Sequence, residues 1–531
     1  MVKRLFHSLL WAAMLGGTTT VQAKQPSKVI PSGKKTTSLG SPAAISGKLK
    51  AALKKTKNAA VSVFAGGYAS GVIISEDGYV LTAAHVLKLS KDRKKDVTIT
   101  LDNGKTFQAI SLGYNIESDF GLLKIKDLKG EKIPFCKIAR SSPATGDFVF
   151  TYSHPSGILK GRPAQTRLGR VTSVRSNEGK PIFLYSDLNI QPGDSGGPLY
   201  NLDGELVGIN SSAALQIEFN IFSAIEQFHL DQERLKKNER WGDNNKSPTN
   251  AEMLKAKFDK ATVAKVQAEL LKRAKAHHYK TTDFVRRYVN DKGEAKINAQ
   301  QMVNFMVKDA ISIANGQQVS LGLDDPEIIK KLKVYKKRPD GFIPFHISDG
   351  SKTITKATSI GNGLLVAKAS LLSGIKSPHL LANKQHHALS VIEKSKELDL
   401  ILLKVGKNVK IPHILFPKRK ITIEAGDGLT APDRYGRPLW NVATDSRREV
   451  KKKRSVGPLQ DKSVISQHRA PYPEAIRHSV PLFAKEAGTP VFDLEGNFVG
   501  IHIARFSRTM GLIIPHEHIQ TFAEKHLNLK K

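Results

Sequence analysis

Three side chains that together can cleave an acyl bond occur in the first half of the chain, in the order His, Asp, Ser. His85 ends a short apolar run, Asp119 stands between a turn and an apolar run, and Ser195 lies in Gly193-Asp-Ser-Gly-Gly-Pro198. A serine hydroxyl attacks a carbonyl efficiently only when a base takes its proton, an acid orients that base and donors stabilise the oxyanion. The sequence therefore offers an imidazole, a carboxylate and a nucleophile for peptide-bond hydrolysis.

The segments around these residues have the pattern of short β-strands. Apolar and β-branched runs alternate with turn residues at 60–64, 71–75, 79–82, 97–101, 121–125, 148–152 and 206–210. Many short strands at this spacing are typical of a β-sandwich or a β-barrel. We therefore expect a mainly β domain in which His85 ends a strand.

The order His, Asp, Ser is that of the chymotrypsin arrangement and not that of α/β-hydrolases or subtilisins. Residues 60–225 resemble a trypsin-like domain, and specifically the bacterial HtrA (Deg) proteases. The resemblance is carried by Ser70-Gly-Val-Ile-Ile-Ser-Glu-Asp-Gly-Tyr79 and by Ser186-Asp-Leu-Asn-Ile-Gln-Pro-Gly-Asp-Ser-Gly-Gly-Pro-Leu199.

The resemblance implies a role for each matching residue. His85 would be the general base and acid, Asp119 its orienting carboxylate and Ser195 the nucleophile. The backbone N–H groups of Gly193 and Ser195 would form the oxyanion hole. Glycine at positions 196 and 197 allows the backbone to turn sharply where a side chain would obstruct the substrate.

The resemblance also locates a specificity pocket for the P1 side chain, the one before the cleaved bond. Its walls would be the segment before the nucleophile, with Asn189 and Ile190, and the strand after it, with Ser211 and Ala213. Asn189 stands where enzymes that cut after Arg or Lys carry an aspartate. Burying a charged side chain without a counter-ion costs on the order of several kcal/mol, so we expect uncharged P1 residues. Glu218 would favour Arg or Lys if it lay on the far wall, but we expect it to face solvent.

Two departures from the family pattern limit what the resemblance carries over. No Ile-Val-Gly-Gly-like activation sequence precedes Ala60, so Asp194 lacks the terminal amine that pairs with this aspartate in animal trypsins. Asp194 therefore needs another partner or faces solvent. HtrA-like enzymes also carry PDZ domains after the protease, whereas here a helical pattern and a second β region follow. The substrate tethering and cage assembly known for that family therefore do not carry over with the resemblance.

The chain divides into five segments by composition and periodicity. Residues 1–23 have the charged start, apolar stretch and small-residue cleavage site of an export signal, with a membrane anchor as the alternative. Residues 24–44 are predicted to be a flexible basic tether, residues 45–235 the protease domain, residues 236–335 an α-helical connector and residues 336–531 a second β domain. We expect export to the periplasm or the exterior of a bacterial cell.

The second β region repeats the first without its chemistry. Asp119 recurs as Asp399 and Gly146-Asp147 as Gly426-Asp427, each 280 positions on. Residues 202–209 recur at 494–501, and Gly71-Val-Ile at Gly363-Leu-Leu, each 292 positions on. These offsets place Ser377 opposite His85 and Ala487 opposite Ser195. We therefore expect two trypsin-like double β-barrel domains joined by an α-helical connector, the second degenerate.

Charge and cysteine content restrict the remaining choices. The formal net charge of +35 is compatible with an anionic envelope polymer or lipid surface as a partner, but a merely solvated basic surface is the favoured interpretation. We expect no nucleic-acid partner, because no nucleic-acid motif accompanies the charge. Cys136 is the only cysteine and is expected in the core, so no intramolecular disulfide can form. We expect no cofactor or metal, since His516 and His518 lack the context of metal ligands. The sequence does not predict an oligomeric state.

Two functions from different classes remain open at this point. The first is a secreted serine endopeptidase with protein or peptide substrates and a catalytically dead second domain. The second is a non-catalytic binding or scaffold protein of the cell envelope built on two protease-like barrels. A fluorophosphonate probe separates them, because it labels only a serine that is activated by its base.

Overall fold

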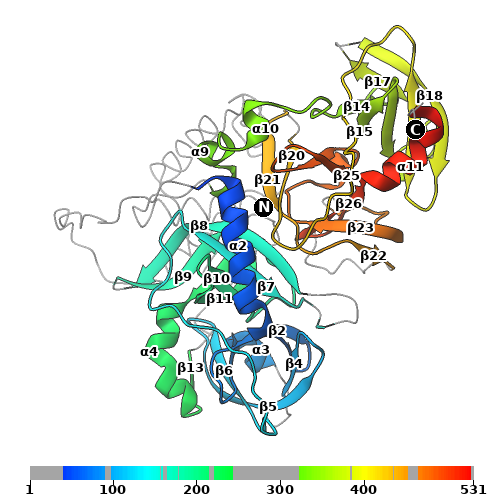
Figure 1. Cartoon of the computed structure of the whole chain (residues 1–531). Coiled ribbons are helices and arrows are strands. Elements are labelled where there is room, and N and C mark those ends of the chain that lie inside the picture. The colour runs from blue at the N-terminus through cyan, green and yellow to red at the C-terminus, as the bar shows by residue number, and fades with distance from the viewer. Residues whose placement is uncertain are drawn as a thin grey trace, which may run out of the picture.

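The computed structural model describes residues 40–89, 97–155, 157–158, 164–177, 179–213, 220–242, 322–382, 385–433, 436–451 and 465–527. Within these residues the strands form four sheets in which nearly all pairs are antiparallel. Three of these sheets close into six-stranded barrels (Figure 1). The prediction of a mainly β fold is confirmed. The expected export signal, most of the tether and residues 243–321 of the expected helical connector lie outside the described residues.

The first two sheets contain the predicted His, Asp and Ser. The first comprises β1 (Ala60–Phe64), β2 (Tyr68–Ile73), β3 (Tyr79–Ala83), β4 (Val97–Leu101), β5 (Thr106–Asn115) and β6 (Phe120–Ile125), closed by pairing of β5 with β6 and extended by β13 (Arg240–Trp241). The second is a closed barrel of β7 (Phe148–Ser153), β8 (Gln165–Asn177), β9 (Lys180–Ser186), β10 (Pro198–Asn201), β11 (Leu206–Ala213) and β12 (Asn220–Ala224). Helices α3 (Ala84–Leu89) and α4 (Ile225–Lys236) follow β3 and β12.

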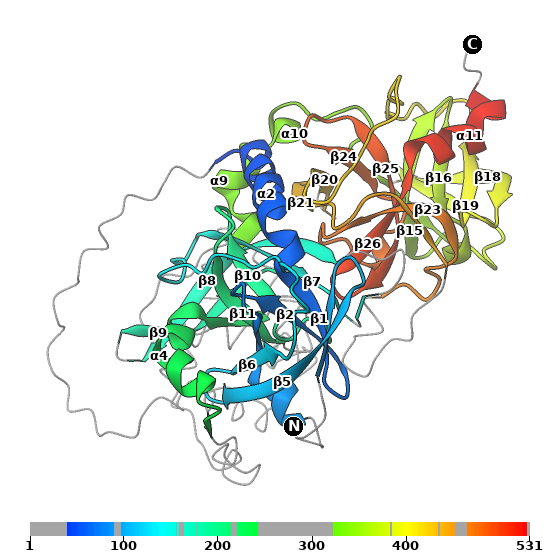
Figure 2. The same ribbon diagram turned by 60° about the horizontal axis from the view of Figure 1, so that its bottom comes forward.

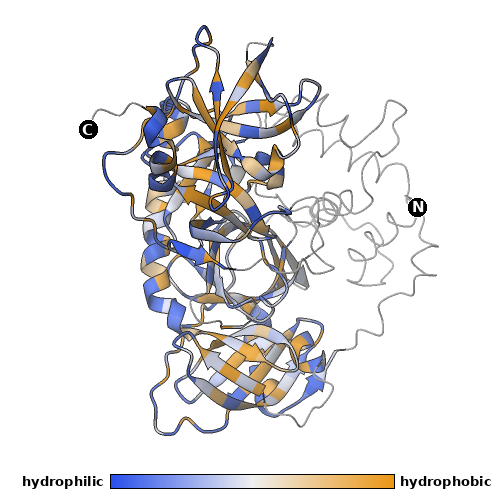
Figure 3. Cartoon of the chain, turned by 90° about the vertical axis from the view of Figure 1, so that its right-hand side faces the viewer, coloured by the Kyte–Doolittle hydropathy of each residue, from blue (hydrophilic) through white to orange (hydrophobic). Residues whose placement is uncertain are grey.

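The strands form where the sequence alternates between apolar and polar residues or is apolar throughout. In β4, Val97, Ile99 and Leu101 are buried while the two threonines between them are partly exposed, the two-residue period of a strand with one face on a core. In β2 and β11 most positions are buried, as expected where both faces of a strand pack against protein. Figure 3 shows hydrophobic residues concentrated in the strands.

The second half of the chain begins with short helices and continues with two more sheets. Helices η3 (Gly322–Asp324), α9 (Pro326–Ile329) and α10 (Lys333–Lys336) precede a closed barrel of β14 (Phe345–Ser348), β15 (Thr353–Gly361), β16 (Leu364–Lys368), β17 (His379–Ala382), β18 (Gln385–Ser395) and β19 (Leu400–Val405), with η4 (Ala369–Leu371) after β16. The last sheet contains β20 (Gly428–Pro432), β21 (Pro438–Val442), β22 (Arg448–Val450), β23 (Tyr472–His478), β24 (Pro490–Asp493), β25 (Phe498–Ser507) and β26 (Met510–Pro515). Helices η5 (Ala484–Glu486) and α11 (His516–Leu527) complete it.

The last sheet has the strand order of the second barrel with one interruption. Strands β20, β24, β25, β26 and β23 are paired in the same sequence as β7, β10, β11, β12 and β9. The long strand β8 has two counterparts, β21 and β22, of which one pairs with β20 and the other with β23. Because the strand is broken between them, the two edges of this sheet are linked only by the short β22 and by the isolated Ala443–His478 bridge.

Local hydrogen bonds show which repeat positions correspond. The N–H of Gly146 donates to the Val171 carbonyl at 2.7 Å, and that of Gly426 to the Ala443 carbonyl at 2.9 Å. The predicted match of Gly71 with Gly363 is wrong, because Gly71 lies within β2 whereas Gly363 lies in the turn before β16. The counterpart of Gly363 is Gly78, since both have a positive φ. The Gly78 carbonyl accepts the N–H of Ile125 at the end of β6, and the Gly363 carbonyl accepts that of Val405 at the end of β19.

Helix α2 (Pro42–Thr56) precedes the first barrel and lies against both halves (Figure 1 and Figure 2). The Ser41 hydroxyl caps it by accepting the N–H of Ala44 at 3.2 Å, and Pro42 suits its first turn. Its buried residues recur every three or four positions, the pattern of a helix with one apolar face: Ile45, Leu49, Ala52 and Leu53.

Contacts from α2 reach the second half of the chain. The Ser46 hydroxyl donates to the Gly426 carbonyl at 2.7 Å and accepts the N–H of Gly428 at 3.1 Å. The Lys50 ammonium pairs with Asp427 at 2.8 Å. The two halves are therefore joined by a helix that precedes both of them in the sequence. No helix of the described ranges is long and apolar enough to cross a membrane.

Candidate active site

His85 and Asp119 are held together by their backbones as well as by their side chains. His85 follows β3 in the first turn of α3, and Asp119 ends the turn before β6 in the left-handed region, with φ of 57°. The N–H of Ala84 donates to the Asp119 carbonyl and that of His85 to Asp119 Oδ1, both at 3.0 Å. The pairing of β3 with β6 thus fixes the distance between the imidazole and the carboxylate.

The imidazole of His85 is oriented by the carboxylate of Asp119. Its Nδ1 lies 3.0 Å from both Oδ1 and Oδ2, and Asp119 Oδ2 also accepts the Ser211 hydroxyl at 2.6 Å. Burial alone would lower the pKa of His85, but the hydrogen bond and charge of Asp119 outweigh it, so the pKa is raised above 6.5. With Nδ1 donating to Asp119, the neutral ring keeps Nε2 as its acceptor.

Ser195 stands after a tight turn that its sequence explains. The N–H of Asp194 donates to the Gln191 carbonyl at 3.0 Å, and Gly193 between them has φ of 93°. Proline followed by glycine at the two central positions is the pattern of a type II turn, in which the second residue needs a positive φ. Residues 191–194 therefore present Ser195 at the end of a defined loop.

Two glycines after Ser195 allow this loop to approach β3 closely. A Cβ atom on Gly196 would lie 2.2 Å from Thr82 Oγ1 and 2.5 Å from the Ala83 nitrogen, and one on Gly197 would meet Ser153 and Asn210. The N–H of Ser70 donates to the Ser195 carbonyl at 2.9 Å. The serine loop thus packs on the residues that immediately precede His85, so the observed reason for glycine at both positions is close packing against protein and not the predicted approach to substrate.

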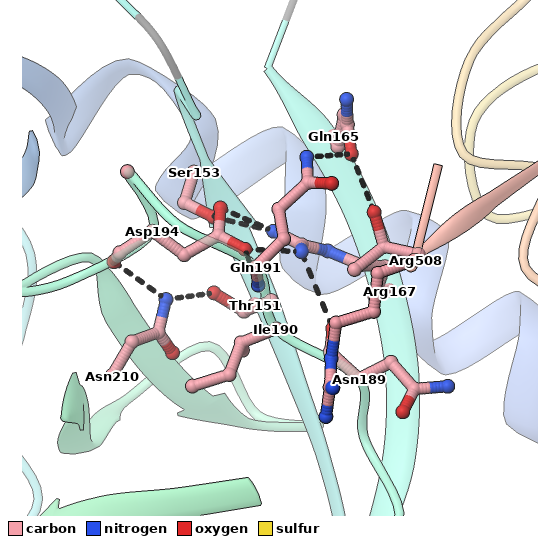
Figure 4. Close-up of polar contacts among 12 residues, drawn as sticks. Thr151, Ser153, Gln165, Arg167, Asn189, Ile190, Gln191, Asp194, Asn210 and Arg508 are labelled. Atoms are coloured by element: carbon pink, nitrogen blue, oxygen red, sulfur yellow. Dashed lines mark hydrogen bonds and ion pairs between the residues drawn. The ribbon is translucent and has the colours of Figure 1, made fainter. Parts of the chain in front are cut away.

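Asp194 has a buried partner that sequence reasoning missed (Figure 4). Arg167 on β8 forms an ion pair with both of its carboxylate oxygens, with Nη2 2.8 Å from Oδ1. The Ser153 hydroxyl and the N–H of Gln191 donate to the same carboxylate, each at 2.7 Å. Of the two alternatives left open for Asp194, the partner is therefore the one observed. An arginine on a strand carries no local signal that distinguishes a buried ion pair from a solvated charge.

The predicted specificity segment is held by a residue absent from the prediction. Asn220 at the start of β12 is fully buried, and its Oδ1 accepts the N–H of Ile190 at 3.0 Å. Its Nδ2 lies 3.4 Å from Asn189 Oδ1. Across the β11–β12 pair Asn220 is opposite Ala213, which is exposed. Ser211 contacts Asp119 through its hydroxyl, as described above, and Glu218 lies outside the described residues.

The corresponding positions of the second half lack an imidazole and a hydroxyl. Asp399 repeats the positive φ of Asp119, and Oδ1 of its carboxylate accepts the N–H of Ser370 at 2.7 Å. The predicted match of Ser377 with His85 is therefore wrong, because Ser370 makes the hydrogen bond that His85 makes in the first half. The prediction used an offset of 292 positions for this segment, and that offset places the counterpart of His85 seven residues too far along the chain.

Ser370 and Lys368 are the side-chain partners of the second aspartate, and the Ser370 hydroxyl donates to Asp399 Oδ2 at 2.8 Å. Lys368 Nζ lies 2.7 Å from Asp399 Oδ2, and both side chains are buried. The His468 ring is 3.8 Å from the same oxygen, beyond hydrogen-bond distance. The carbonyl of Ala487 accepts the N–H of Lys356 at 3.2 Å, as that of Ser195 accepts the N–H of Ser70. Ala487 therefore occupies the position that corresponds to Ser195.

Cys136 is buried, as predicted, and burial raises the pKa of its thiol to about 12. Because a thiol reacts as its thiolate, this pKa excludes Cys136 as a nucleophile near neutral pH. Within the described ranges no cluster of three His, Cys, Asp or Glu residues has the geometry of a metal site.

Comparison with known proteins places residues 69–209 in the family described as trypsin-like peptidase domain. The chain is 32% identical over 146 residues to a probable periplasmic serine endoprotease, DegP-like, of Halomonas elongata, covering 27% of this chain and 28% of that protein. It is 36% identical over 149 residues to putative protease Do-like 14 of Arabidopsis thaliana, covering 27% and 34%. It is 29% identical over 220 residues to serine endoprotease DegS of Haemophilus influenzae, covering 40% and 63%.

The family match falls in the first half of the chain. The chain spans about a third or less of the length of the first two relatives, and less than two thirds of the third. Residues 69–209 are therefore similar to trypsin-like peptidase domains, and the relatives include DegP-like proteases.

Proposed function

We propose that the protein is an exported serine endopeptidase of the HtrA/Deg type that hydrolyses peptide bonds through an acyl-enzyme. The observation that carries the proposal is the pairing of His85 Nδ1 with Asp119 at 3.0 Å beside the loop that presents Ser195. Its substrates are proteins or peptides, as the names of its relatives imply. Export rests on the sequence of residues 1–23 and on relatives named periplasmic.

In the proposed mechanism Nε2 of His85 takes the proton of Ser195 as the hydroxyl attacks the scissile carbonyl. Asp119 stabilises the imidazolium that forms, and the N–H groups of Gly193 and Ser195 stabilise the oxyanion. His85 then protonates the leaving amine, and a water molecule activated by the same ring hydrolyses the acyl-enzyme. The Arg167–Asp194 pair holds the loop next to the nucleophile and takes no part in proton transfer.

The second half is proposed to be a degenerate trypsin-like domain without catalysis. Three features support this: the shared strand order, the shared backbone hydrogen bonds around Asp399 and Ala487, and the replacement of the imidazole and the hydroxyl. The Asp399 carboxylate is engaged by Lys368 and by the Ser370 hydroxyl, so it orients no histidine. We propose that this half serves the first through the contacts made by α2 and by β25–β26.

The test is labelling of the full chain with a fluorophosphonate, which reacts only with an activated serine. We expect one adduct, mapped by mass spectrometry to Ser195, and its loss in Ser195→Ala. Ser390→Ala, at an exposed serine of β18, is the matched control and is expected to label normally. Absence of labelling in the folded wild-type protein would refute the proposal and favour the non-catalytic binding protein. An adduct within residues 480–492 would refute the assignment of the second half.

A further inference from the structure

The turn between β25 and β26 reaches from the second half of the chain into the first. Its residues Arg508 and Thr509 are 5% and 1% exposed, so both side chains are buried where the halves meet. Arg508 Nη2 donates to Asn220 Oδ1 at 3.3 Å, and the Thr509 hydroxyl donates to Gln165 Oε1 at 3.2 Å. Figure 4 shows Arg508 beside Gln165, Arg167 and Asn189.

Each acceptor of these bonds also binds the segment that leads to Ser195. Asn220 Oδ1 accepts the N–H of Ile190 at 3.0 Å, and Gln165 Oε1 accepts Gln191 Nε2 at 3.4 Å. The N–H of Gln191 in turn donates to Asp194 Oδ2 at 2.7 Å. Two short chains of hydrogen bonds therefore run from the turn of the second half to residues 190–194.

Residues 190–194 depend on such side-chain partners because they belong to no strand. The N–H groups of Ile190 and Gln191 are satisfied by the side chains of Asn220 and Asp194, where a strand would use a neighbouring backbone. Their geometry is therefore set by how firmly those side chains are held. Asn220 and Gln165 are 0% and 4% exposed, so water does not readily replace a partner they lose.

Strand β8, which carries Arg167, also forms a backbone hydrogen bond to the second half. The N–H of Thr166 donates to the carbonyl of Thr444 at 3.2 Å, at the break between β21 and β22. Residues 165, 166 and 220 thus each bind the second half, and the first two directly precede Arg167 on β8.

We propose that Arg508 and Thr509 are positioning residues of the peptidase, which hold residues 190–194 in the geometry that substrate and oxyanion binding require. The second half would then act on the active site in cis, through one turn, although it carries no catalytic group. This inference rests on the proposed peptidase function. It assigns a role to residues more than 300 positions beyond Ser195 in the sequence.

The test compares variants of the full chain by fluorophosphonate labelling rate, by kcat and KM on a fluorogenic peptide that the wild type cleaves, and by thermal midpoint. Thr509→Val removes the hydroxyl at nearly constant volume and is expected to lower labelling rate and kcat about five- to tenfold. Thr509→Ser keeps the hydroxyl and should stay within about twofold of the wild type. Arg508→Gln should lower both rates about tenfold or more, because a bond from a charged donor is lost.

The matched control is Lys50→Gln, which breaks another contact between the halves, the Lys50–Asp427 pair on α2. It should leave the labelling rate within about twofold of the wild type. If Thr509→Val labels like Thr509→Ser, or if Lys50→Gln slows labelling as much as Arg508→Gln, the contacts are merely structural and the inference is wrong. If Arg508→Gln does not fold, the comparison of the two Thr509 variants decides. If the wild-type protein does not label at all, the proposed peptidase function is refuted. This outcome differs from the two outcomes that refute only the positioning role of Arg508 and Thr509.

Discussion

Replacement of Arg167 by methionine tests whether the buried Arg167–Asp194 pair holds the nucleophile loop. The substitution keeps most of the side-chain volume and leaves the Asp194 carboxylate, which is 0% exposed, without its counter-ion. Removing one member of a buried ion pair costs about 3 to 5 kcal/mol. Asp194 retains two donors, Ser153 and the Gln191 N–H, and each contributes about 1 kcal/mol.

We therefore expect a loss near the lower limit, about 3 kcal/mol in the free energy of unfolding. If the loop rearranges instead of the whole domain, the same energy lowers the population of the reactive geometry by roughly a hundredfold. Urea denaturation measures the first quantity, and the fluorophosphonate labelling rate measures the second. A lower free energy of unfolding, a lower labelling rate, or a smaller decrease in both is expected if the pair holds the loop.

Two further variants make this prediction refutable. Arg167→Met combined with Asp194→Asn removes both charges, so it should recover much of the loss, with a coupling energy of at least about 1 kcal/mol in the double-mutant cycle. Arg170→Met on the same strand breaks the pair with Asp325 and should not slow labelling. A coupling energy below about 0.5 kcal/mol, together with an unchanged labelling rate in Arg167→Met, would show that the pair does not hold the loop.

Three other outcomes are expected. Because His85 must be neutral to act as a base and its pKa is raised above 6.5, the labelling rate should rise with pH through a midpoint above 6.5; a midpoint at or below that value would contradict the pairing with Asp119. A peptide-library digest should show uncharged P1 residues, because Asn189 offers no counter-ion; dominant cleavage after Arg or Lys that is abolished by Glu218→Gln would reverse this expectation. Ala487→Ser should yield no second adduct by mass spectrometry, since Ser370 stands where the first half has His85; an adduct there would show a usable base.

Prediction of strands from the sequence was most accurate where the apolar pattern of a short strand is clear. The motifs around His85 and Asp119 lie at the ends of short apolar strands, and β1 and β4 have the predicted limits, residues 60–64 and 97–101. Strand β8 was not predicted, because its polar and charged residues obscure the two-residue period. The burial of Arg167 follows only from the pairing of β8 with β7 and from the position of the serine loop.

Contacts between the halves were beyond the reach of sequence patterns. Arg508 and Thr509 stand in a polar turn that would be expected to face solvent, and only the docking of two distant sheets buries them. The failed match of Ser377 with His85 has a related cause. Insertions between strands change the repeat offset from one segment to the next, so a single offset cannot be carried across a turn.

Helix α2 imposes an order on the assembly of this chain. It is made among the first residues of the domain, yet the Ser46 hydroxyl binds Gly426, 380 positions later. Contacts of such long sequence separation form late, since the intervening chain must first be brought together. A chain synthesised only as far as residue 400 would contain His85, Asp119 and Ser195 and still leave the contacts of α2 with the second half unmade. The contacts of α2 with the second half can therefore form only after residues 426–428 have been synthesised.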